Sequence, residues 1–129
     1  RREYDEALGC YDRMLAVDDR YTKAWYNKGV ALTEMRRNGA AIRCYDEVLT
    51  LNPGVGMVYT NKGYCLAQMG MYAEALELFE IALEINPDDT TALNNKAAAL
   101  KQLGRDVEAS AIMDEVMRQT DGRGPYSVM

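Results

Sequence analysis

A repeat of 34 residues is the feature that most constrains how this chain folds. Small residues recur at this spacing, at Ala7, Ala41, Ala75 and Ala109. Large apolar residues recur four positions later, at Tyr11, Tyr45, Phe79 and Met113. A fixed period of roughly 20 to 50 residues is typical of proteins that stack one small structural unit against the next. The sequence therefore predicts a stack of similar units.

Each unit contains two helical segments. Within a segment, apolar residues are three or four positions apart, as in Ala75, Phe79 and Ala82, which is the spacing of one helix face. Units end at Asn52-Pro53 and Asn86-Pro87, because proline does not continue a helix. The pattern predicts helices over residues 3–17, 22–35, 39–51, 56–69, 72–85, 90–103 and 106–119. We therefore expect each complete unit to be a helical hairpin.

Composition and charge favour a soluble folded protein. The chain has 129 residues, of which 48% are hydrophobic and 27% charged, and its formal net charge is −5. No apolar run approaches the roughly 18 residues typical of a membrane span, so no membrane partner is expected. The acidic balance and the lack of a basic cluster argue against a nucleic-acid partner. Since the chain opens without Met and already in helical periodicity, we expect it to be part of a larger protein.

The chemistry-bearing residue types argue against catalysis. The chain has no histidine and three cysteines, none in a Cys-x-x-Cys pair, so neither the usual zinc arrangements nor the commonest general base is present. We also find no glycine-rich phosphate loop. We therefore predict no enzyme activity, no catalytic residue, no metal site and no cofactor. An odd number of cysteines favours reduced thiols and a cytoplasmic location. Cys10 and Cys44 share a repeat position with Leu78, which predicts apolar packing for both.

The repeated positions resemble the tetratricopeptide repeat. One unit carries the matching series Trp25, Gly29, Leu32, Ala41, Tyr45 and Pro53. The next carries Tyr59, Gly63, Leu66, Gly70, Ala75, Phe79, Ala82 and Pro87. The resemblance covers residues 3 to about 120 and implies an all-α fold, a right-handed superhelical stack of antiparallel helix hairpins. It divides the chain into a half repeat (1–21), three repeats (22–55, 56–89 and 90–120) and a C-terminal tail (121–129).

The chain departs from the family pattern in two places. Arg36 stands where the family usually has glycine between its two helices, so we expect that turn to differ in shape from those at Gly70 and Gly104. In the last unit, Leu93 and Met113 replace the typical aromatic residues, which suggests a terminal or diverging repeat.

The resemblance implies a protein-protein interaction scaffold that binds a partner peptide in a concave groove lined by the first helix of each repeat. The candidate groove residues are Lys23, Tyr26, Asn27, Val30, Met57, Thr60, Asn61, Tyr64, Thr91, Asn94, Asn95 and Ala98. Asn27, Asn61 and Asn95 recur at the repeat spacing, and their amides match the main chain of an extended peptide. Alternatively, these amides satisfy neighbouring helices or face water. For Met57 the alternative is core packing.

Two further predictions concern charges and ends. Lys28, Lys62 and Lys96 also follow the period, and we expect their stems to lie along a neighbouring helix with the charge in solvent. Acidic residues of the second helices are expected on a solvated convex face. Apolar residues at the two ends lack a neighbouring repeat, which makes a homo-oligomer through the stack ends the alternative function. They are Tyr4, Leu8 and Leu15 at the start and Ile112, Val116 and Met117 at the end.

Overall fold

The computed structural model describes residues 2–121, and over this range it consists of seven α-helices. They are α1 (Arg2–Val17), α2 (Thr22–Glu34), α3 (Asn38–Leu51), α4 (Gly56–Gln68), α5 (Tyr72–Ile85), α6 (Thr90–Gln102) and α7 (Asp106–Asp121). Each begins and ends within two residues of its predicted bounds. Asp121, expected in the tail, belongs to α7, and residues 122–129 lie outside the described range.

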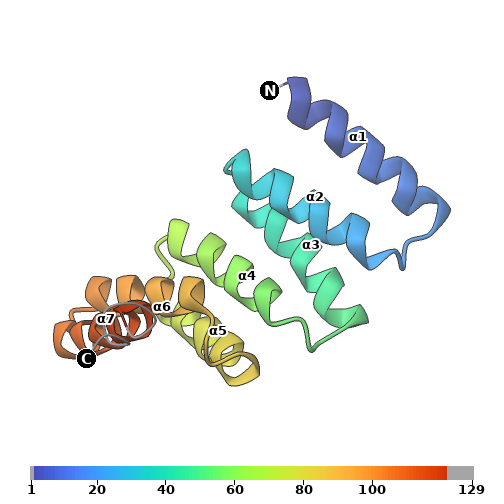
Figure 1. Cartoon of the computed structure of the whole chain (residues 1–129). Coiled ribbons are helices and arrows are strands. Elements are labelled where there is room, and N and C mark those ends of the chain that lie inside the picture. Colours follow the sequence, from blue (N-terminus) through green and yellow to red (C-terminus); the bar gives the residue numbers. More distant parts are fainter. Residues whose placement is uncertain (1, 122–129) are drawn as a thin grey trace.

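The helices are stacked in chain order. Figure 1 shows them side by side from α1 at one end of the array to α7 at the other. The hairpins are α2–α3, α4–α5 and α6–α7, and α1 packs against α2. The prediction of an all-α stack of helical hairpins is confirmed. No helix between residues 2 and 121 is long and apolar enough to cross a membrane.

A glycine facing an aromatic ring sets the distance between the two helices of a hairpin. A Cβ atom built on Gly29 would lie 2.6 Å from the ring of Tyr45, and one on Gly63 would lie 2.6 Å from the ring of Phe79. Both rings are fully buried, at 1% and 0% exposure. The missing side chain therefore makes the space that each ring fills, which explains why the two residue types recur together.

The other periodic aromatic residues attach a helix to the loop before it. Trp25 Nε1 donates a hydrogen bond to the carbonyl of Asp19 at 2.7 Å, and the hydroxyl of Tyr59 donates to the carbonyl of Pro53 at 2.8 Å. Trp25 and Tyr59 are half-buried rather than part of the closed core. Their polar tips therefore explain why an amphipathic ring is used at this position.

The three turns inside the hairpins have the same shape, so the prediction that Arg36 alters its turn is wrong. Arg36 has φ 62°, close to the 81° of Gly70 and the 80° of Gly104. Its amide bonds the carbonyl of Thr33, as the Gly70 amide bonds that of Ala67, both at 3.0 Å. The repeat geometry thus holds a non-glycine residue in the left-handed region, at a cost of about 1–2 kcal/mol.

A buried polar cluster distinguishes the first joint between hairpins, where α2–α3 meets α4–α5, from the second, where α4–α5 meets α6–α7. The hydroxyl of Thr33 lies 2.8 Å from that of Tyr45 and 3.3 Å from Sγ of Cys65, and it donates to the carbonyl of Gly29. Burial raises the pKa of both Tyr45 and Cys65 above their ordinary values. In the next joint the same three positions are Ala67, Phe79 and Ala99, so the whole cluster is replaced by apolar residues.

Thr33→Ala should lower the free energy of unfolding by about 1–3 kcal/mol, because it leaves the buried Tyr45 hydroxyl without its partner. The triple variant Thr33→Ala, Tyr45→Phe, Cys65→Ala recreates the apolar set of the second joint and should recover most of this loss. Urea unfolding followed by circular dichroism measures both. A triple variant less stable than the single one would show that the hydroxyl partnership is not the cause.

Candidate functional site

Two depressions lie along the face that carries the candidate groove residues. The first, of about 490 Å³, is lined by Met57, Thr60, Asn61 and Thr91 together with residues of the α5–α6 loop. The second, of about 280 Å³, brings together Tyr64 of α4 with Asn95 and Ala98 of α6. Seven candidates from two helices therefore line open space, and Met57 is 55% exposed, which excludes core packing for it.

The remaining candidates line neither of these depressions. Tyr26, Asn27 and Val30 of α2 are half-buried, and Lys23 is exposed beside them. Asn94 lies further along, in a cavity between α6 and α7. The structure thus places the best-formed part of the candidate groove on α4 and α6 rather than evenly along the array.

Sequence reasoning missed several residues that line the depressions. Asn86 and Asp89 of the α5–α6 loop border the first, and Gln68 and Gln102 border the second. Asp89 also caps α6 by accepting a hydrogen bond from the amide of Ala92 at 3.1 Å, and the hydroxyl of Thr60 donates to its other oxygen at 3.4 Å. Gln68 and Gln102 are one period apart, which is the signal that could have found them.

The three periodic asparagines differ in their contacts. The amide nitrogen of Asn61 donates to the hydroxyl of Tyr26 at 3.2 Å, so this side chain links α4 to α2. Asn27 and Asn95 are half-buried and make no side-chain hydrogen bond within residues 2–121. Asn61 thus partly satisfies a neighbouring helix, whereas the amides of Asn27 and Asn95 remain available to another molecule.

The periodic lysines form ion pairs, which corrects the prediction that their charge stands in solvent. Nζ of Lys28 lies 2.8 Å from Asp12, Nζ of Lys62 lies 2.7 Å from Asp46, and Lys96 pairs with Glu80 at 3.7 Å. The lysine side chains are only 24–25% exposed. Each pair joins the first helix of a hairpin to the helix before it, so the acidic partners do not belong to a purely solvated face.

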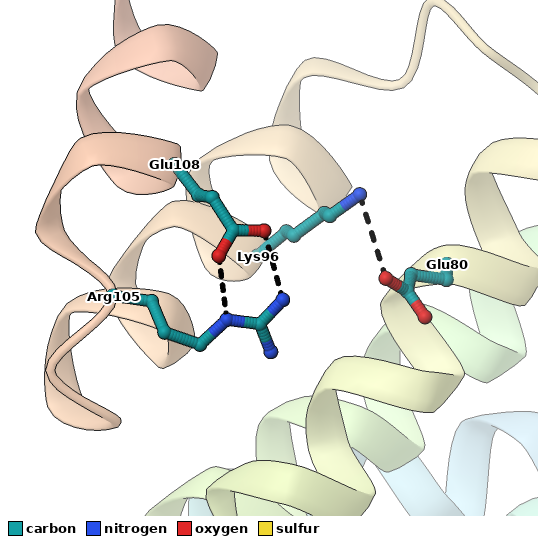
Figure 2. Close-up of polar contacts among 4 residues, drawn as sticks. All are labelled: Glu80, Lys96, Arg105 and Glu108. Atoms are coloured by element: carbon teal, nitrogen blue, oxygen red, sulfur yellow. Dashed lines mark hydrogen bonds and ion pairs between the residues drawn. The ribbon is translucent and has the colours of Figure 1, made fainter.

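A fourth pair extends the charged row toward the end of the array. Figure 2 shows Lys96 of α6 reaching Glu80 of α5 beside the bidentate contact of Arg105 with Glu108, whose distances are 2.7 and 2.8 Å. The hydrogen bonds from Arg105 hold the pKa of Glu108 below its usual value. These side chains are well exposed, and we attribute to them local order at the start of α7 rather than a binding role.

The two ends of the stack are less apolar than predicted. Leu15 and Val116 are buried, and Leu8 and Ile112 pack against core clusters. Cys10 is exposed, so the prediction that it packs like Cys44 is wrong, because among the described helices α1 packs mainly against α2, which leaves Cys10 uncovered. Burial raises the pKa of the Cys44 thiol, as it does for Cys65. Residues 2–121 contain no cluster of side chains suited to holding a metal ion.

The model of the tetratricopeptide repeat family matches residues 22–55 and 57–89, more than half of the chain. The curated proteins contain no match to the sequence.

Solved structures of MamA have the same fold. The one described as "MamA MSR-1 C2" has a TM-score of 0.83 and 20% identity, with 95% of this chain covering 70% of that chain. A MamA crystal structure gives 0.87 and 21%, with coverages of 93% and 70%. MamA from Desulfovibrio magneticus RS-1, from residue 41 to its end, gives 0.88 and 17%, with coverages of 93% and 68%. Because these identities are low, the comparison supports a shared fold and nothing further.

Proposed function

Because this chain belongs to the tetratricopeptide repeat family and is a protein-interaction scaffold, we propose that it binds an extended peptide of a partner protein along α2, α4 and α6. The observation that carries the proposal is the row of amides at Asn27, Asn61 and Asn95, two of which have no hydrogen-bond partner among residues 2–121. An amide can both donate to and accept from a peptide main chain without reading its side chains.

Apolar contacts beside the amides support the same site. Met57 and Tyr64 are 55% and 42% exposed, and they border the two depressions described above. Flexible methionine and amphipathic tyrosine side chains are suited to contacting ligand side chains. Most lining residues are uncharged, with Asp89 the charged side chain at the first depression. We therefore propose a ligand that is largely uncharged along the segment held by α4 and α6.

The state of the cysteines supports a cellular location for the protein. Cys10, Cys44 and Cys65 are all free, and Cys44 and Cys65 are buried in the core. Free buried thiols are typical of proteins kept in a reducing environment. We propose that the scaffold works in the cytoplasm.

The test is a comparison of partner capture by the wild-type chain and by the triple variant Asn27→Ala, Asn61→Ala, Asn95→Ala. Losing about three hydrogen bonds should lower the affinity for a captured partner about tenfold to a hundredfold. The double variant Asn27→Ala, Asn95→Ala keeps the bond between Asn61 and Tyr26, so it separates lost ligand contacts from a reshaped groove. Titration of a peptide from the captured partner measures the affinities.

A matched control alters three exposed residues of the second helices: Glu47→Ala, Glu77→Ala and Glu84→Ala. This control should retain the partner at wild-type affinity, and circular dichroism should show equal helicity for all variants. A partner that binds the asparagine variants and the wild type equally would rule out the groove as its site.

Self-association through the stack ends is the second candidate. Its support is the exposure of Met113 and Met117 on α7, at 41% and 59%. It is weakened by the burial of Leu15 and Val116, which closes part of the surface that it would use. Sedimentation equilibrium at high concentration tests it, and a monomer throughout would exclude it.

A further inference from the structure

The first depression, of about 490 Å³, is the part of the proposed groove that can distinguish one ligand side chain from another. Of the described residues that line it, only Asp89 is charged. The row of amides contacts the main chain of the ligand, which is nearly the same at every residue and therefore fixes no register. A charged position at one place along the groove would supply that register.

The carboxylate of Asp89 has room for a further hydrogen-bond donor. One oxygen accepts from the amide of Ala92 at 3.1 Å, and the other accepts from the hydroxyl of Thr60 at 3.4 Å. Each carboxylate oxygen can accept two hydrogen bonds, so one acceptor position remains on each. Asp89 forms no ion pair with any of residues 2–121. Because Asp89 lines the depression and is half-buried, a donor placed there can contact it.

Few basic residues surround this carboxylate in the sequence. Between residues 44 and 95 the chain has one basic residue, Lys62, which pairs with Asp46 at 2.7 Å. Glu84 and Asp88 of the same stretch add negative charge. The N-terminal end of α6 contributes only about half a positive charge, so the net charge beside the depression remains negative. A cationic group of a ligand is therefore favoured here over an anionic one.

The wall of the depression suits the stem of a long side chain. Met57 and Ile85 are 55% and 44% exposed, and Val55 completes the apolar lining. Lysine and arginine have three or four methylene groups before the charge, and such stems pack on apolar surface while the charged head stays hydrated. The repeat position of Asp89 is occupied by Tyr21 and Val55 in the preceding units, so the carboxylate marks a single joint of the array.

We propose, resting on the function proposed above, that the first depression binds a lysine or arginine side chain of the ligand peptide. The cationic group contacts Asp89, and the methylene groups pack against Met57 and Ile85. This one side chain fixes the register in which the peptide lies along the amide row. The ligand therefore carries a single basic residue within an otherwise uncharged segment.

Blocked single amino acids test this site before any partner is known. N-acetyl-lysine N-methylamide is titrated into the full chain, and the chemical shifts of the Met57 and Ile85 methyl groups report its binding. A probe of this size should bind with a Kd of about 1–10 mM. The norleucine and glutamate analogues lack the positive charge and should bind about three- to tenfold more weakly. The arginine analogue should bind as the lysine probe does.

Asp89→Asn removes the charge and keeps a side chain suited to capping α6. It should lower the affinity for the lysine probe to that for the norleucine analogue. Asp88→Asn is the matched control, because it makes the same substitution at an adjacent, exposed residue that does not line the depression. This control should bind the lysine probe as the wild type does, and circular dichroism should show equal helicity for both variants.

Equal binding of the lysine and norleucine probes, equal losses in the two aspartate variants, or unchanged shifts at Met57 and Ile85 would each overturn the proposal. Stronger binding of the lysine probe by a chain carrying Arg123→Ala would also overturn it, in favour of a basic residue of this chain as the occupant. Partner capture that is unaffected by the asparagine variants would instead refute the amide row and leave the basic side-chain site standing.

Discussion

Gly63→Val is expected to lower the free energy of unfolding by about 3 kcal/mol, the upper part of the range for overpacking a closed core. Even the Cβ atom would lie 2.6 Å from Phe79 Cε1, and that ring is fully buried and surrounded by other core residues. Replacing glycine inside a helix favours the helix by up to about 1 kcal/mol, which is smaller than the steric cost. Thermal and urea unfolding measure the difference.

Gly39→Ala is the matched control, because a Cβ atom there meets nothing within 4 Å. Gly39 lies in α3 and is exposed, so this change should stabilise the chain by about 0.5–1 kcal/mol. Adding Phe79→Leu to Gly63→Val should restore part of the stability by making room for the valine. Equal stability of Gly63→Val and the wild type would show that the helices separate at little cost.

Phe79→Ala should cost about 3–5 kcal/mol, the range for removing a fully buried aromatic side chain. Phe79 packs in one cluster with Leu66 of α4 and Ala99 of α6, so its loss weakens both its own hairpin and the next joint. In a stack where each unit contacts its neighbours, such damage stays local. Hydrogen exchange should therefore show α6 and α7 losing protection before α2 and α3.

Met113→Ala is the control for this prediction, since it truncates the same repeat position where the side chain is 41% exposed. We expect a cost below about 1 kcal/mol, because much of the methionine already contacts water. Uniform loss of protection over all helices in Phe79→Ala would contradict a local effect and indicate that the array unfolds as one unit.

The order and bounds of the helices were predictable because small and large residues recur at fixed positions of each repeat. The two helices of a hairpin touch where a glycine faces an aromatic ring, as Gly29 faces Tyr45 and Gly63 faces Phe79. Shape and size are properties of single residues, so a period in the sequence becomes a period in the structure. The family match covers the two units in which this pattern is most regular.

The ion pairs and hydrogen bonds between helices were not predictable, because each depends on two residues that only the fold brings together. Lys62 pairs with Asp46 only because two helices bring them together, and the spacing of 16 positions has no meaning on a single helix. The bond between Asn61 and Tyr26 is likewise visible only once α2 and α4 are adjacent. Arg36 was misjudged for the opposite reason, since its intrinsic preference is overridden by the turn that its neighbours impose.

The stacking order also makes the spacing of α2, α4 and α6, the helices of the proposed binding face, depend on the angles at the joints. Beyond its sequence neighbours, α4 contacts both α2 and α6, so the first helices touch one another as well as their hairpin partners. The joints follow one another between the two ends of the array (Figure 1), so small changes of angle at each joint add along the stack. A ligand that binds both α2 and α6 and brings them closer would therefore bend the whole array. A force that separates the ends would in turn lower the affinity for that ligand.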